Sequence, residues 1–162
     1  MNNPLENKEI LSEEILNAIY KLLESSEDIV FGGSLCLNAL DLINRPIKDL
    51  DIFTLNGNSL NYYNLIKFIT NADDELLSET TTDVNGDIIV RQGAKVDNVN
   101  ICIFKVNNLS YSTFTLYGRK IKIQNVNDAI LAKRAYSTFE YKSAQKHKDD
   151  LNSIDNEFEL LF

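Results

Sequence analysis

Apolar and polar residues alternate with two different periods along the chain, and the change of period separates helices from strands. Over residues 12–25, 59–70, 126–136 and 141–153 the pattern predicts amphipathic helices. A further helix is expected from Ser34 to Arg45-Pro46, because the residue before a proline avoids the α region. Runs rich in β-branched and aromatic residues predict strands at 29–31, 47–55, 79–83, 88–91, 99–106, 114–117 and 121–123.

The order of these elements predicts an α+β fold, in which a small mixed sheet is flanked by helices and further helices lie at the C-terminal end. With 162 residues, of which 44% are hydrophobic, the chain can bury a sizeable core, and no repeat or linker interrupts it. We therefore expect a single domain over residues 1–162, with a core at about 12–106 and C-terminal strands and helices at about 112–155.

Composition and charge limit the classes of partner. A net charge of −8 disfavours non-specific nucleic-acid binding, which needs a basic surface, but it allows a small nucleotide bound with a divalent cation. Cys36 and Cys102 lie far apart in apolar segments, which predicts buried, reduced thiols. No apolar run reaches the ~18 residues of a membrane span, and no signal-peptide pattern opens the sequence. These features predict a cytoplasmic protein with no membrane partner.

The first candidate motif is Gly32-Gly33-Ser34, which follows an apolar strand and opens a predicted helix. Glycines let backbone amides approach a phosphate, and a helix starting at Ser34 would direct free N–H groups and the serine hydroxyl to the same point. The motif could also be an ordinary strand-to-helix turn, so it indicates phosphate binding only together with other evidence.

The second candidate motif is Asp49-Leu50-Asp51 on the next predicted strand. Residues two apart on a strand project from one face, so the two carboxylates would repel each other unless a cation lies between them. Mg²⁺ prefers carboxylates together with phosphate oxygens. The alternative is a solvated strand whose carboxylates pair with Lys48 or Arg45.

The conjunction of the two motifs resembles the nucleotidyltransferase superfamily of the DNA polymerase beta-like minimal fold. Its signature is a Gly-Ser or Gly-Gly-Ser after one strand and an Asp-x-Asp on the next. The resemblance implies that Gly32, Gly33 and Ser34 hold the triphosphate of an NTP. It also implies that Asp49 and Asp51 ligate Mg²⁺ (or Mn²⁺), and that basic residues on the later helices, here Lys133 and Lys146, contact the nucleotide.

The family pattern also implies a third carboxylate, which should lie on the strand 99–106. That strand offers Asn100, Cys102 and Phe104 on the relevant face and no acidic residue. Either Asp97 reaches in from the start of the strand as the third catalytic carboxylate, or Asn100 replaces it. His147, between two lysines, is expected at the surface.

Two functions follow from this pattern. The first is a metal-dependent enzyme that transfers a nucleoside monophosphate from an NTP to a hydroxyl of a protein, an RNA or a small molecule. The second is a catalytically degenerate relative that works by binding a nucleotide or a protein, as an antitoxin-like or regulatory factor.

Overall fold

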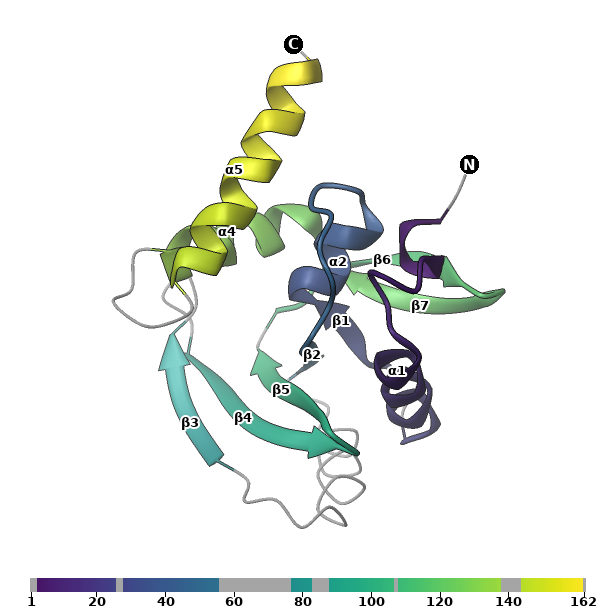
Figure 1. Cartoon of the computed structure of the whole chain (residues 1–162). Helices are drawn as coiled ribbons and strands as arrows, with labels where there is room; N and C mark the ends of the chain where they lie inside the picture. Colours follow the sequence, from purple (N-terminus) through teal and green to yellow (C-terminus); the bar gives the residue numbers. More distant parts are fainter. Residues whose placement is uncertain are drawn as a thin grey trace.

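In a computed structural model the chain forms one mixed seven-stranded sheet with helices packed against it (Figure 1). The structure describes residues 3–25, 28–55, 77–82, 88–106, 108–137 and 144–161. The predicted helix at 59–70 lies outside these residues.

The described helices occupy both ends of the chain and the connection between the first two strands. The Ser12 hydroxyl accepts a hydrogen bond from the Ile15 amide at 3.3 Å and so caps the first α-helix. None of the described helices is long and apolar enough to cross a bilayer. Their bounds are Pro4–Glu6 for the 3-10 helix, Glu13–Ser25 for α1, Gly33–Ala39 for α2, Val126–Ser137 for α4 and Ala144–Leu161 for α5.

The sheet has the strand order β3-β4-β5-β2-β1-β7-β6. β2 runs parallel to β5 and β1 runs parallel to β7, whereas the other neighbours are antiparallel. This arrangement confirms the predicted α+β class with a mixed sheet. The strands are β1 (Val30–Gly32), β2 (Leu50–Leu55), β3 (Leu77–Thr82), β4 (Ile88–Val96), β5 (Val99–Val106), β6 (Tyr111–Leu116) and β7 (Arg119–Gln124).

The central strands present two chemically different faces. On what we call the helix-covered face, Leu50, Ile52, Ile101 and Ile103 pack into one core with residues of α1 and α2. On the other side, which we call the carboxylate face, the alternation of β2 and β5 places Asp51 beside Cys102 and Phe53 beside Phe104. The Phe53 and Phe104 rings stack with their centroids 4.8 Å apart.

The second strand begins three residues later than its sequence pattern predicts. β2 starts at Leu50, and Asp49 is an exposed residue that precedes it. The Ile47 amide donates to the Ile10 carbonyl at 2.8 Å, so this segment pairs with the N-terminal region, and the Ile47 side chain enters the core on the helix-covered face. The prediction that Asp49 and Asp51 both lie on this strand and project from one face is therefore wrong, because Asp49 precedes the strand.

The helix α2 ends at Ala39 and does not extend to Arg45-Pro46 as predicted. Asp41 adopts a left-handed conformation with φ 59°. The Asp41 amide donates to the Asn38 carbonyl at 3.0 Å and the Leu42 amide to the Leu37 carbonyl at 2.9 Å, which is the hydrogen-bond pattern of a Schellman C-cap. Glycine is usual at this left-handed position, and because aspartate occupies it here, the sequence does not indicate that the helix ends.

Candidate functional site

The pairing of β1 with β2 brings the two candidate motifs to one place. The strands are antiparallel, and Gly32 lies opposite Asp51 in the register. The end of β1, where the Gly-Gly turn begins, therefore meets the start of β2, where Asp-x-Asp lies. The register pair Gly32 and Asp51 is where the Gly-Gly turn and the Asp-x-Asp motif meet.

Gly33 lies directly against the Asp51 carboxylate. Its φ of 59° is in the left-handed region, and a Cβ added at this position would collide with the Asp51 side chain. A Cβ on Gly32 would collide with the Phe53 ring and with Oε1 of Gln124. Both glycines are needed because side chains of β2 and β7 fill the space where their own Cβ atoms would lie.

Gln124 is a site residue that the sequence motifs did not indicate. It is the last residue of β7, is 8% exposed, and its Oε1 accepts a hydrogen bond from the Gly33 amide at 3.4 Å. The parallel pairing of Phe31 with Ile123 places Gln124 beside Gly32. Only the strand order, which pairs residues about 90 positions apart, reveals this neighbour.

Ser34 follows Gly33 in the first turn of α2 and is 8% exposed. Its carbonyl accepts a hydrogen bond from the Asn38 side chain at 2.8 Å, and the Asn38 Oδ1 accepts one from the Arg45 amide at 3.2 Å. Asn38 thus ties the start of α2 to the loop that leads to Asp49. Because α2 has only seven residues, its dipole is a minor part of any anion binding here.

Asp49 and Asp51 are the residues near the Gly33 turn whose carboxylate oxygens could hold a divalent cation. Asp51 is half-buried between the Gly33 turn and Cys102, and Asp49 is exposed one residue before the strand. Two carboxylates with remaining positions filled by water and phosphate oxygens are a normal Mg²⁺ arrangement. Within the described residues, however, no three histidine, cysteine, aspartate or glutamate side chains form a metal-binding group.

The structure does not bring Asp97 to this pair. Asp97 lies in the turn between β4 and β5 with φ 53°, and its two carboxylate oxygens accept hydrogen bonds from Lys21 of α1 at 2.8 and 2.7 Å. Because α1 packs on the helix-covered face, Asp97 lies on the opposite side of the sheet from Asp51. Asn100, the alternative, is an exposed residue of β5 that pairs with Lys95 in the β4–β5 hairpin.

Lys133 belongs to a buried ionic cluster that joins α4, α5 and the loop after α2. Its Nζ lies 2.7 Å from Oδ2 of Asp150, and Arg45 holds the same carboxylate through two contacts of 2.7 and 2.8 Å. The Lys133 and Asp150 side chains are 6% and 3% exposed. The sequence predicts Lys133 as a nucleotide ligand, but its role as a partner of Asp150 depends on how the successive helices α4 and α5 pack against each other and against Arg45.

The cluster changes the pKa values of its members. Burial lowers the pKa of Lys133, and its contacts with Asp150 oppose only part of that effect. Burial would raise the pKa of Asp150, but hydrogen bonds from Arg45 and Lys133 outweigh burial and lower it. Removing the Asp150 charge would leave the buried Lys133 and the partly buried Arg45 without their shared partner.

His147 is half-buried in this cluster and not at the surface as its sequence context predicts. Its Nδ1 lies 3.0 Å from the Lys133 Nζ, so a protonated Lys133 requires a neutral imidazole that accepts at Nδ1. Burial, followed by the charges of Lys133 and Lys146, lowers the pKa of His147 from 6.5 to about 4. Lys146, the second predicted nucleotide ligand, is the more accessible of the two lysines.

Comparisons with known proteins give two distant structural likenesses. JHP933 from Helicobacter pylori matches with a TM-score of 0.44 and 17% identity, over 94% of this chain and 70% of that one. A candidate nucleotidyltransferase from H. pylori matches with a TM-score of 0.37 and 16% identity, over 80% of this chain and 61% of that one. No protein-family model and no curated protein matches the sequence.

The contact between Gly33 and Asp51 predicts a specific cost for a side chain at residue 33. A left-handed φ costs a non-glycine residue roughly 1–2 kcal/mol, and a collision in a packed site adds about 1–3 kcal/mol. Gly118→Ala is the matched control, because Gly118 also has a positive φ (79°) but its Cβ would meet nothing within 4 Å. In chemical denaturation, Gly33→Ala should lose more free energy of unfolding than Gly118→Ala, and equal losses would show that Asp51 does not pack on Gly33.

The lowered pKa of His147 predicts a dependence of stability on pH. Between pH 6.5 and about 4 the unfolded chain binds a proton at His147 that the folded chain does not, so the free energy of unfolding falls as the pH falls. One such proton gives a slope of at most about 1.4 kcal/mol per pH unit. His147 is the single histidine of the chain, so His147→Gln should flatten the denaturation free energy over this range. An unchanged slope in this variant would contradict the prediction.

Proposed function

We propose that the protein is a metal-dependent nucleotidyltransferase that transfers a nucleoside monophosphate from an NTP to a hydroxyl group. The observation that carries this proposal is the contact of the Asp51 carboxylate with Gly33 at the start of α2. A turn suited to an anionic phosphate has a carboxylate against it, and a divalent cation bound by Asp49 and Asp51 would allow both anions to remain there.

In this proposal the residues of the chain bind and orient the nucleotide. The backbone of Gly32 and Gly33 and the hydroxyl of Ser34 hold phosphate oxygens, while Lys146 and, through a rearranged cluster, Lys133 contact the nucleotide. Asp49 and Asp51 would hold Mg²⁺ or Mn²⁺, which supplies Lewis-acid stabilisation of charge on the phosphate oxygens. Asp97 could complete a catalytic set only if it left its ion pair with Lys21.

The transfer has a simple balance of bonds. An oxygen of the acceptor hydroxyl attacks the α-phosphorus, the bond from this phosphorus to the bridging oxygen breaks, and pyrophosphate leaves. The hydroxyl proton passes to water. The acceptor would be a protein, an RNA or a small molecule.

A second function is favoured by the placement of Asp97. Among the described residues no third carboxylate joins Asp49 and Asp51, because Asp97 pairs with Lys21 on the other side of the sheet. A protein with this site could bind a nucleotide without turning it over and act through a protein partner. The two functions make opposite predictions for turnover.

Substitution of Asp51 tests the enzymatic function. With α-labelled NTPs, Mg²⁺ or Mn²⁺, and small RNAs and proteins as acceptors, the wild type should release pyrophosphate and transfer label. Asp51→Asn should lower both by at least about 100-fold, because it removes one charged metal ligand. Asp41→Asn is the matched control, since Asp41 is exposed at the end of α2 and asparagine tolerates its positive φ.

The control variant should retain full activity. Nucleotide binding with no turnover by the wild type would favour the binding function, and equal activity of Asp51→Asn and wild type would contradict the proposed site.

A further inference from the structure

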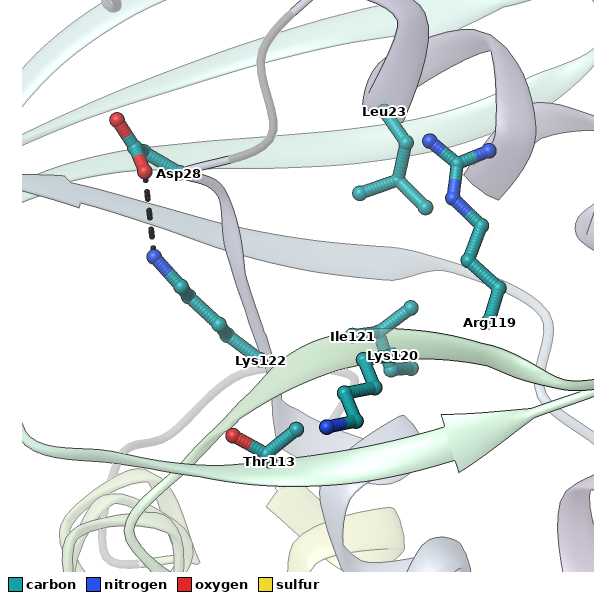
Figure 2. A pocket seen from close by; sticks show the side chains of 7 residues that line it. All are labelled: Leu23, Asp28, Thr113, Arg119, Lys120, Ile121 and Lys122. Atoms are coloured by element: carbon teal, nitrogen blue, oxygen red, sulfur yellow. Dashed lines mark hydrogen bonds and ion pairs between the residues drawn. The ribbon is translucent and has the colours of Figure 1, made fainter.

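A pocket of about 400 Å³ lies beside β7, away from the carboxylate pair. β1 pairs in parallel with β7 only at Val30↔Lys122 and Phe31↔Ile123, so the first residues of β7 extend beyond the start of β1. The end of α1 and the residue Asp28 border the space that this leaves (Figure 2). The pocket and the Gly33 turn thus lie at opposite ends of β1.

The lining of this pocket is basic in an acidic protein. Its charged side chains are three cations and one carboxylate, which gives a local net charge of +2 in a chain with a net charge of −8. Figure 2 shows Lys122 and Arg119 on opposite sides of the pocket, with Lys120 and Thr113 below them in the view. The lining consists of Leu23, Asp28, Thr113, Arg119, Lys120, Ile121 and Lys122.

Most of this positive charge is not neutralised within the described part of the chain. There, neither Arg119 nor Lys120 makes an ion pair; the Arg119 guanidinium lies over the Tyr20 ring at 5.9 Å from its centroid. Lys122 pairs with Asp28 at 3.2 Å, but these side chains are 29% and 62% exposed, so solvent weakens the pair. An incoming anion could therefore compete with Asp28 for Lys122 at little cost.

The remaining lining residues define the rest of the ligand. Leu23 and Ile121 are core residues, 4% and 2% exposed, that supply the apolar part of the lining, and Thr113 adds a hydroxyl on β6 opposite Lys122. Cations together with a hydroxyl suit phosphate oxygens, and an apolar part of the lining suits an organic group. The volume is in the range of small-molecule sites.

We propose that this pocket binds the phosphate ester of a nucleotide through Arg119, Lys120 and Lys122, with its organic group against Leu23 and Ile121. The same chemistry is offered by a free nucleoside monophosphate and by the phosphorylated end of a nucleic-acid strand. The proposal does not depend on nucleotidyl transfer, because the Gly33 turn and the carboxylate pair lie beyond the other end of β1.

Calorimetric titrations test the proposal at low ionic strength with EDTA, so that no metal links a phosphate to Asp51. The probes are inorganic phosphate, a nucleoside 5′-monophosphate and a 5′-phosphorylated single-stranded oligonucleotide. The test variant is Arg119→Gln/Lys120→Gln, and Lys95→Gln is the control, because Lys95 is exposed on β4 beyond β2 and β5 in the sheet order.

At least one nucleotide probe should bind the wild type and Lys95→Gln alike, and the double variant at least about tenfold more weakly. If the monophosphate binds more tightly than the oligonucleotide, the ligand of the pocket is a free nucleotide. Tighter binding of the oligonucleotide, with a salt slope that becomes shallower by about 1.4 in the double variant, identifies a strand end.

The proposal is overturned if no nucleotide probe binds at millimolar concentration, if inorganic phosphate binds as tightly as both, or if the double variant binds like the wild type. It is also overturned if Asp51→Asn abolishes binding, which would place the ligand at the other site. If the double variant does not fold, the single substitution Lys120→Gln carries the test, because in the described structure Lys120 has no ion pair or hydrogen bond to lose.

Discussion

The close approach of Gly33 to the Asp51 carboxylate is the constraint on which the candidate site depends. It fixes glycine at residue 33, because the backbone is left-handed and the space for a Cβ is filled by Asp51. It also fixes the register of β1 and β2, since a shift of one residue would turn Asp51 toward the helix-covered face and bury its charge in the core. The glycine turn, the register of β1 and β2, and the position of the Asp51 carboxylate therefore depend on one another.

A second set of polar contacts holds the C-terminal helices against this framework. Arg45, in the loop between α2 and β2, reaches Asp150 on α5, and Lys133 on α4 shares the same carboxylate. A buried carboxylate with two cations is strongly destabilised when one partner is removed, so the cluster favours a single placement of α4 and α5. Through Arg45 and Asn38 it is connected to the loop that leads to Asp49 and to the start of α2.

The sequence was sufficient for features that depend on local pattern. The α+β class followed from the periodicities, and the bounds of β5 agree with the prediction at both ends. Features that depend on tertiary contacts could not be predicted from local sequence pattern. Asp41 ends α2 in a left-handed conformation, which an aspartate in the sequence does not indicate. Asp97 forms an ion pair with Lys21 and does not join Asp49 and Asp51. Gln124 lies 91 positions from its partner Gly33, and Arg45 lies 105 positions from its partner Asp150. The basic pocket beside β7 could not be predicted from the composition, because the chain as a whole has a net charge of −8.

The most direct test of the central claim is the position of a bound metal–nucleotide complex. In backbone amide NMR spectra, substoichiometric Mn²⁺ with an NTP should broaden the signals of Gly32, Gly33, Ser34, Asp49 and Asp51 first. The signals of Asp97 and Gly118, which lie away from the pair, should remain sharp at the same metal concentration. Broadening centred on Asp97, or spread evenly over the acidic surface, would contradict the assignment of the Gly33–Asp51 contact as the metal–nucleotide site.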